Sequence, residues 1–226
     1  MTLARLLPSS AAEAAALAAL PRRRSVLTTL VLALPVTLVA CSASLLPKPA
    51  APPTRYTLDG PPGPALPAVP ASAGVLAVAP LRAAPGFDSR HMLYLQQPQV
   101  IEAFAQNEWV DTPARLLAPL LVQALQGRGA FAAVLLLPSS ATARWRLETE
   151  LVRLYQDFSG QPSQLRLTLR AVLVDTASRR VVAAREFDER EPATSADPAG
   201  GAAAAQRASQ RLLRAVAGFC VDHTRG

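Results

Sequence analysis

The chain has 226 residues, of which 50% are hydrophobic and 17% are charged, and its formal net charge is +7. After residue 40 its arginines are scattered along predicted strands, without the basic stripe and aromatic platforms that bind a phosphate backbone, which argues against a nucleic-acid-binding protein. The two histidines, His91 and His223, lie far apart in sequence and leave almost no material for a zinc site or a histidine-activated nucleophile.

Residues 1–40 have the layout of an export signal. Three arginines at positions 22–24 precede an apolar run over residues 26–39, which at 14 residues is shorter than the ~20 that a membrane-spanning helix needs. A basic segment, a short apolar segment and small residues before a cleavage site are typical of a signal peptide. Residues 1–20 form an extension before this pattern, and we exclude them from the folded domain.

The apolar run ends in Leu38-Val39-Ala40-Cys41, which resembles the bacterial lipobox. The resemblance implies that the Cys41 thiol receives a diacylglycerol group and that Cys41, as the new N-terminus, is N-acylated. Because three acyl chains hold a protein on a bilayer far more firmly than one, we expect a lipid-anchored protein with no cofactor besides these covalent lipids. The alternative is a secretory signal that ends beside a cysteine by chance.

The residues after Cys41 predict where the protein is sorted and how it is held. Ser42 stands where an aspartate would favour the inner membrane, so we expect the outer membrane, with the domain facing the periplasm. Residues 41–73 are rich in Pro and Ala and predict a tether that lifts the domain off the headgroups. Within it, residues 56–58 are a candidate edge strand.

The folded domain is expected over residues 74–226. Without residues 1–40 the chain has 186 residues, with 19 basic and 15 acidic side chains and a net charge of +4. This length suits one domain with its own core. If Cys41 carries lipid, Cys220 has no partner for an intramolecular disulfide, and we interpret it as a small buried hydrophobe on a helix.

Periodicity predicts strands, a helix, more strands and a final helix along this domain. Thr112 and Pro113 begin the first helix, Gly127 closes it, and Pro119 is expected to kink it. A turn is expected over residues 107–111 and a loop over residues 192–201. The predicted strands are residues 74–79, 91–97, 99–106, 131–137, 144–158, 164–175 and 181–189, and the helices are residues 113–126 and 202–222. This order favours an α+β fold, a largely antiparallel (mixed) sheet with two helices packed on one face.

Two clusters invite a catalytic interpretation. Glu148 and Glu150 share a strand face, but Arg144 and Arg146 have the same parity, which indicates a solvated, charge-balanced face. The string Asp88-Ser89-Arg90-His91 carries reactive types, yet neighbours in a loop seldom converge on one another. We therefore expect no enzyme.

The segment from residue 79 to the first helix contains a recognisable pattern. Its residues are Ala79-Pro80, Ala84-Pro85-Gly86-Phe87-Asp88-Ser89-Arg90, Met92, Tyr94, Phe104, Trp109, Asp111 and Pro113. The pattern resembles the ABC-type transport auxiliary lipoproteins, the family that includes PqiC, and the similarity covers about residues 56–219. The interior Pro119 departs from the family's pattern.

The aromatic residues of this segment allow two roles. Phe87, Tyr94, Phe104 and Trp109 lie within 23 residues and either pack a core or anchor an interface. The candidate partner-binding residues are Phe87, Asp88, Arg90, Tyr94 and Trp109. For Asp88 and Arg90, the other role is to fix the loop by local hydrogen bonds.

The family resemblance implies a non-catalytic accessory lipoprotein of an MCE-type ABC transporter that moves lipid between the inner and outer membranes. Its expected partners are the periplasmic MCE component, the membrane and further copies of itself in a homo-oligomer. Two alternatives stay open: a periplasmic lipid carrier, which needs an internal cavity, and an outer-membrane assembly lipoprotein.

Overall fold

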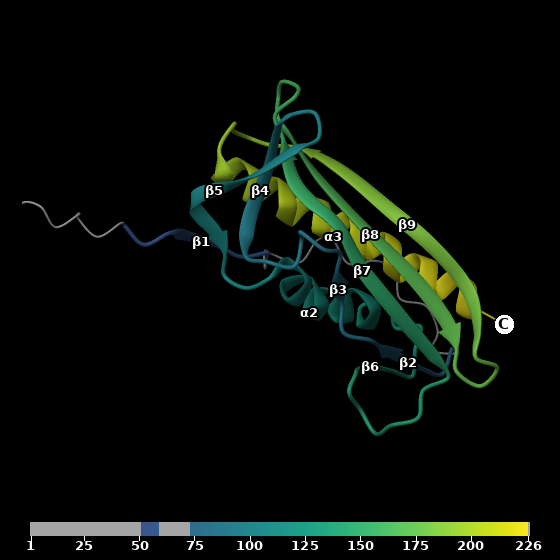
Figure 1. Cartoon of the computed structure of the whole chain (residues 1–226). Coiled ribbons are helices and arrows are strands. Elements are labelled where there is room, and N and C mark those ends of the chain that lie inside the picture. Colours follow the sequence, from purple (N-terminus) through teal and green to yellow (C-terminus); the bar gives the residue numbers. More distant parts are fainter. Residues whose placement is uncertain (1–50, 59–72, 226) are drawn as a thin grey trace, which may run out of the picture. The chain divides into compact units, whose positions relative to one another are not determined.

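The computed structural model describes residues 51–58 and 73–225, which belong to one compact unit that begins at Ala51 (Figure 1). The predicted signal peptide, Cys41 and most of the predicted tether lie outside the described residues. A short strand is found near the candidate edge strand, but β1 covers Thr54–Tyr56 and shares only Tyr56 with the predicted residues 56–58. Leu58, two residues further on, is 2% exposed and belongs to the core, so part of the segment predicted as tether is built into the folded unit.

In the described part of the chain, nine strands form one mixed sheet. The other strands are β2 (Val75–Val78), β3 (Arg82–Ala83), β4 (His91–Gln97), β5 (Val100–Trp109), β6 (Ala133–Leu136), β7 (Trp145–Asp157), β8 (Gln164–Asp175) and β9 (Arg180–Pro192). The long ladders, β7 with β8 and β8 with β9, are antiparallel, as is the β4–β5 hairpin. The remaining ladders, which join β1 to β5, β2 to β6, and β2, β3 and β4 to β7, are short and parallel.

Strand β7 organises this sheet because it is long enough to pair with several strands. One of its edges pairs with β8 along nearly its whole length, from Trp145 opposite Asp175 to Asp157 opposite Gln164. Its other edge pairs in succession with β2, β3 and β4. The β4–β5 hairpin is thereby held beside the β7–β8 hairpin, and the amide of Phe158 donates to the carbonyl of Leu95 at 2.8 Å.

Two helices complete the fold, α2 (Pro113–Gln126) and α3 (Pro198–Thr224). α3 packs along β8 and β9, and α2 contacts α3, β6 and β7 (Figure 1). Alternation in β8 turns its leucines toward these helices, because Leu165, Leu167, Leu169 and Leu173 are all at most 2% exposed. The predicted α+β class, a mixed sheet with two helices, is therefore confirmed.

Local sequence explains where the helices begin and end. Pro113 occupies the first turn of α2, but the predicted Thr112 side-chain cap makes no hydrogen bond to the helix. Instead, the Asp111 carboxylate accepts from the Thr112 amide at 2.7 Å. Gly127 is the C-cap, with φ of −61° and therefore without the left-handed conformation that glycine favours at this site. Asp197 caps α3 by accepting from the Gly200 amide at 2.7 Å.

Two glycines at the start of α3 are required by close packing. A Cβ at Gly200 would collide with the backbone of Ser195, and a Cβ at Gly201 would collide with the Gln156 side chain. Gly218, in the same helix, has open space where a Cβ would lie. The first two positions therefore allow the N-terminal turn of α3 to approach β7 and the preceding loop.

Three predicted boundaries were wrong, two because strand pairing outweighs local sequence and one because a helix cap was not foreseen. The turn expected over residues 107–111 is largely strand, since Asn107, Glu108 and Trp109 pair with β1. β9 runs to Pro192 because its charged end pairs with β8 over residues 189–192. α3 begins at Pro198, four residues before the predicted start, because Asp197 caps the Pro-Ala-Gly-Gly stretch that predicts a loop.

Candidate functional site

The loop before β4 holds the first three candidate partner-binding residues. Phe87 is half-buried, and its amide donates to the carbonyl of Ala84 at 3.0 Å in a turn. Asp88 and Arg90 are exposed. The Ser89 hydroxyl accepts from the backbone amide of His91 at 3.4 Å, so its contact is with the chain and not with the imidazole ring.

Arg90 joins a charge cluster that ties this loop to the sheet. Its Nη2 lies 3.8 Å from Oε1 of Glu108 on β5, and Nε of Arg55 on β1 donates to the same oxygen at 2.8 Å. The carboxylate side chain is 17% exposed, whereas the two arginines are 46% and 55% exposed. Arg90 therefore anchors the loop through a residue distant in sequence, and both guanidinium groups keep a face open to solvent.

Trp109 does not belong to an interaction surface. It is 3% exposed in the core, and its amide donates to the carbonyl of Arg90 at 2.8 Å. Of the two roles that the sequence allows for it, the structure supports core packing, and a partner cannot reach its ring in this conformation. This burial corrects the candidate set.

Tyr94 belongs to an aromatic cluster at the base of the β4–β5 hairpin. Its ring centroid lies 4.5 Å from that of Phe104 on β5 and 6.0 Å from that of Phe158, which follows β7. Glu102 accepts a hydrogen bond from the Tyr94 hydroxyl and thereby raises the pKa of that phenol. Sequence reasoning missed Phe158, because only the parallel pairing of β4 with β7 brings it beside β4.

A small hollow lies between the hairpin, the sheet and the start of α3. It has room for about one water molecule and is lined by Met92, Leu93, Phe104, Trp109, Leu154, Tyr155, Gln156, Leu165 and Gly201. The pockets that bind drug-sized ligands are far larger, at ~300–1,000 Å³. Nε2 of Gln156 donates to the Ser163 hydroxyl at 2.9 Å, and its Oε1 is buried without a partner. The lining side chains include no carboxylate, imidazole, thiol or amine, and the one ionisable group among them is the Tyr155 phenol, which is hydrogen-bonded to Arg166.

The sheet face opposite the helices is polar and internally paired. Arg170 on β8 bridges Glu150 on β7 at 3.1 Å and Glu186 on β9 at 3.3 Å. Glu148 pairs with Arg146 at 3.1 Å. This arrangement confirms the prediction of a charge-balanced face, with Glu148 and Glu150 both in ion pairs.

Asp188 and Thr168 show how tightly this face is paired. Burial disfavours the charged form of Asp188, but hydrogen bonds from Thr168 and Arg166 outweigh it and hold the pKa of the carboxyl below its usual value. Thr168 is fully buried although it lies on the polar face. The charged groups named on this face are therefore paired with one another by ion pairs and hydrogen bonds.

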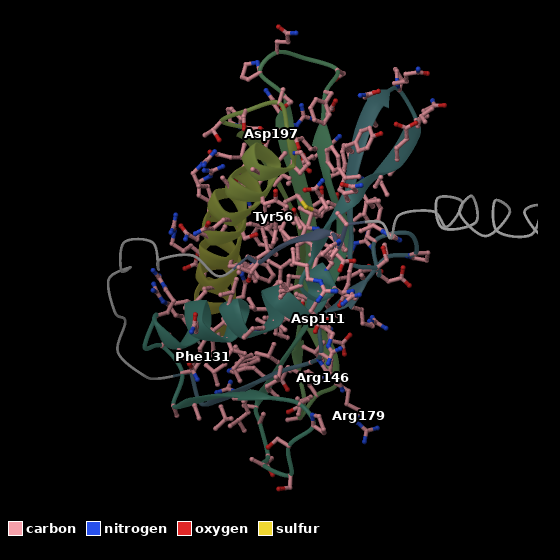
Figure 2. All side chains as sticks on the ribbon, turned by 90° about the vertical axis from the view of Figure 1, so that its left-hand side faces the viewer. Tyr56, Asp111, Phe131, Arg146, Arg179 and Asp197 are labelled. Carbon is pink, nitrogen blue, oxygen red and sulfur yellow. The ribbon has the colours of Figure 1, made fainter. Side chains whose placement is uncertain are left out.

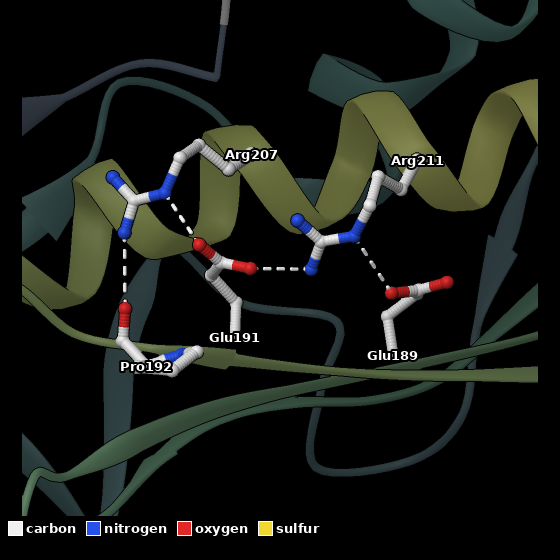
Figure 3. A network of polar contacts seen from close by, with 5 residues as sticks. All are labelled: Glu189, Glu191, Pro192, Arg207 and Arg211. Atoms are coloured by element: carbon white, nitrogen blue, oxygen red, sulfur yellow. Dashed lines mark hydrogen bonds and ion pairs between the residues drawn. The ribbon is translucent and has the colours of Figure 1, made fainter.

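A second charge network joins β9 to α3 (Figure 3). Glu191 pairs with Arg207, whose Nη2 also donates to the carbonyl of Pro192 at 3.0 Å, and with Arg211. Arg211 also pairs with Glu189 at 3.1 Å. Burial opposes the charge on Glu191, yet the hydrogen bonds from both arginines keep its pKa below the usual value. The network fixes the helix to the last strand of the sheet.

Cys220 and His223, the other two residues of reactive type, contact only the fold around them. Cys220 is fully buried in α3, and burial raises the pKa of its thiol to about 12. Nδ1 of His223 lies 2.9 Å from the carbonyl oxygen of Phe219. Within residues 51–58 and 73–225, no group of three or more His, Cys, Asp or Glu side chains is placed to hold a metal ion. The helices in this part of the chain also include none that is both long and apolar enough to cross a membrane.

Two solved structures are similar to this fold. The protein XCC0632 from Xanthomonas campestris has a crystal structure with 26% identity and a TM-score of 0.65, over 76% of this chain and 96% of that one. A second crystal structure, of an uncharacterized protein, has 12% identity and a TM-score of 0.58, over 75% of this chain and 99% of that one. No match was found among curated proteins.

The family model that matches describes an ABC-type transport auxiliary lipoprotein component, and it covers residues 56–217. That range runs from β1 into the last turns of α3 and so spans nearly all of the described fold. Membership of a lipoprotein family implies anchoring to a membrane, and the auxiliary role implies an ABC transporter as partner. The chain belongs to the ABC-type transport auxiliary lipoprotein family.

Proposed function

We propose that this protein is a non-catalytic accessory subunit of an MCE-type ABC transporter that moves lipid between the inner and outer membranes. It docks the periplasmic MCE component and ties the transport machinery to a membrane through acyl chains on Cys41. The observation that carries the proposal is the family match over residues 56–217, nearly the whole folded unit.

The anchor and its location are part of this proposal. Leu38-Val39-Ala40-Cys41 supplies the lipidation sequence, and Ser42 favours the outer membrane, with the domain in the periplasm. Further copies of the chain assemble with it as a homo-oligomer. Replacing Cys41 by Ala leaves the precursor uncleaved and without palmitate label. Palmitate incorporation that persists in this variant contradicts the assignment of the lipid site.

The docking surface that we propose is centred on the loop before β4. Phe87, Asp88 and Arg90 place a half-buried ring, an exposed carboxylate and an exposed guanidinium on one short segment, which the Arg90–Glu108 pair holds against the sheet. Tyr94 follows on β4 with a half-buried ring. A partner that presents an apolar anchor beside charged groups complements this surface.

The test is capture of the intact complex from the native host. The protein carries a C-terminal tag at its chromosomal locus and is purified in mild detergent, and the bound proteins are identified by mass spectrometry. Recovery of an MCE protein with an ABC ATPase and permease supports the proposal. Recovery of an outer-membrane β-barrel without them supports an assembly role instead and overturns it.

A matched pair of variants locates the docking surface. Arg90→Glu reverses an exposed charge in the proposed surface, and Arg179→Glu reverses one in the β8–β9 turn, far from that loop in the fold. We expect Arg90→Glu to reduce recovery of the MCE protein at least several-fold and Arg179→Glu to leave it unchanged. Equal recovery with both variants places docking elsewhere.

The carrier alternative makes a different prediction. A lipid carrier has to enclose an acyl chain, and the hollow beside Gln156 has room for only about one water molecule unless sheet and helices separate. Native mass spectrometry of the purified protein is expected to show no lipid beyond the covalent chains on Cys41. A stoichiometric, exchangeable lipid supports the carrier.

A further inference from the structure

Two hairpin turns lie together at one end of the folded unit and carry no charge. Residues 92–101 of the β4–β5 hairpin and residues 158–165 of the β7–β8 hairpin contain no Asp, Glu, Lys or Arg. The two turns are neighbours because Leu95 pairs with Asp157 and accepts a hydrogen bond from the Phe158 amide. Three carboxylates border these turns, since Glu102 pairs with Tyr94, Asp157 with Leu95 and Glu191 with Leu165. We name the charge-free residues 92–101 and 158–165 the neutral end.

The tip of the neutral end exposes large aliphatic side chains. Val100 and Ile101, at the start of β5, are 43% and 45% exposed. The turn before them is narrow, since Pro98 and Gln99 alone connect Gln97 to its partner Val100, and Gln99 has φ of 69°. Glutamines 96, 97 and 99 surround these aliphatic groups with neutral amides. Such a tip is a rigid, amphipathic projection.

The opposite end of the long strands has a different composition. The β8–β9 turn carries Asp175, Arg179 and Arg180, and the Ser178 amide donates to the Asp175 carboxylate at 2.9 Å. Figure 2 shows Arg179 near one end of the folded unit and Asp197, at the start of α3, near the other. The Asp197 carboxylate accepts hydrogen bonds from the Ser195 hydroxyl and the Gly200 amide.

The anchored segment joins the fold within reach of the neutral end. β1 is parallel to β5 with Thr54 opposite Asn107, so the chain before Thr54 approaches from the end of β5 that carries Val100. Asn107 is seven positions after Val100 in the sequence, which corresponds to about 24 Å along a strand. Residues 41–53 are 13 in number, and a chain of that length spans at most about 45 Å. A lipid on Cys41 therefore allows a bilayer to touch the tip.

We propose that the neutral end is a second membrane contact, with Val100 and Ile101 inserted among the headgroups of the bilayer that holds the Cys41 lipids. Aliphatic side chains gain by leaving water, and the turn over residues 96–101 brings no ion with it. Glu102 and Asp157 lie further from the turn, opposite Tyr94 and Leu95. Neutral amides beside the aliphatic side chains remain hydrogen-bonded to headgroups and water. This contact rests on the lipid anchor of the proposed function and would set the orientation of the domain over the membrane.

The test reports the depth of one side chain in the full-length, lipidated protein. Ile101→Cys and, as control, Val181→Cys are each labelled with the environment-sensitive fluorophore NBD; Val181 is 61% exposed and lies near the charged turn. The Cys41 thiol is blocked by lipid, and Cys220 is fully buried. Both proteins are reconstituted into liposomes of phosphatidylethanolamine and phosphatidylglycerol, without other proteins, that contain nitroxide-labelled lipid.

We expect the nitroxide lipid to quench the label at position 101 at least threefold more strongly than the label at position 181, with a blue-shifted emission at position 101 only. Liposome flotation is measured on the same samples. If the proteins float and the two labels are quenched equally, the membrane contact is overturned while the lipid anchor stands. If they do not float, the anchor itself fails and the contact fails with it.

A second copy of the chain is the competing occupant of this tip. In that case the label at position 101 is shielded from aqueous iodide but not quenched by nitroxide lipid, and the shielding decreases when the protein is diluted among more liposomes. This result overturns the membrane contact and assigns the neutral end to self-association.

Discussion

The two hairpins that meet at Leu95 and Asp157 are built by the same pairing rules but have opposite surfaces. Along β7, β8 and β9 the charged residues find partners within the chain, as in the Glu150–Arg170–Glu186 series. On the β4–β5 hairpin the run from residue 92 to residue 101 has no charges, and the tip leaves aliphatic side chains exposed. The charges of the first surface are paired within the molecule. The exposed aliphatic side chains of the second surface would leave water only on contact with a membrane or a partner.

The largest change in the free energy of unfolding is expected from a substitution in the core beneath the charged face. Leu169 on β8 is fully buried between the sheet and α3. Leu169→Ala removes packed methyl groups and is expected to lower the free energy of unfolding by about 2–5 kcal/mol. Chemical denaturation measures the change. A loss below about 1 kcal/mol contradicts the assigned core.

The start of α3 provides a pair of opposite effects. Gly200→Ala places a Cβ against the Ser195 backbone, and we expect a loss of about 1–3 kcal/mol in the free energy of unfolding. Gly218→Ala adds a Cβ in open space within the same helix and should stabilise the protein by up to about 1 kcal/mol, because alanine has the better helix propensity. Thermal unfolding distinguishes them. Equal shifts for the two variants contradict the packing of this turn.

The β9–α3 network predicts a pH dependence. The folded-state pKa of Glu191 lies below its ordinary value of 4.5, so its ion pairs stabilise the fold above about pH 4.5 and are lost as the pH falls through the lowered pKa. Glu191→Gln should lower the free energy of unfolding by about 1 kcal/mol at pH 7. The difference from the parent should shrink as the pH falls well below 4.5. A difference that stays constant with pH would assign the effect to packing instead of charge.

The smallest expected effect on stability sharpens the contrast between the two ends. Ile101→Ser and Val181→Ser both replace exposed aliphatic side chains, so each should change the free energy of unfolding by no more than about 0.5 kcal/mol. A loss above about 1 kcal/mol for Ile101→Ser shows that the tip is packed within the fold and is not a free surface.

The sequence predicted elements whose signal is local and failed where long-range pairing decides. β8 was predicted over its full length, because its leucines alternate with polar residues throughout. The extension of β5 to Trp109 could not be predicted, because it depends on pairing with β1, which joins residues more than fifty positions apart. Pairing with β8 likewise explains why the acidic end of β9 is strand, although Glu and Asp disfavour strands.

The candidate site was predicted only in part for the same reason. The sequence indicated an aromatic segment but could not decide between core and surface, and the structure buries Trp109 while Tyr94 stays half-exposed. The contact of Arg90 with Glu108 and the placement of Phe158 beside Tyr94 depend on the order of strands in the sheet. The sequence shows that Val100 and Ile101 lie in an uncharged stretch, but it does not show that their side chains are exposed.

The central claim is that a lipid anchor holds this folded module on a membrane, and the intact mass of the native protein tests it most directly. The protein is extracted from the envelope of its native host and measured whole. We expect a mass equal to residues 41–226 plus a diacylglycerol and a further acyl chain, recovered from the membrane fraction. A polypeptide with an unmodified N-terminus, recovered from the soluble periplasm, contradicts the account.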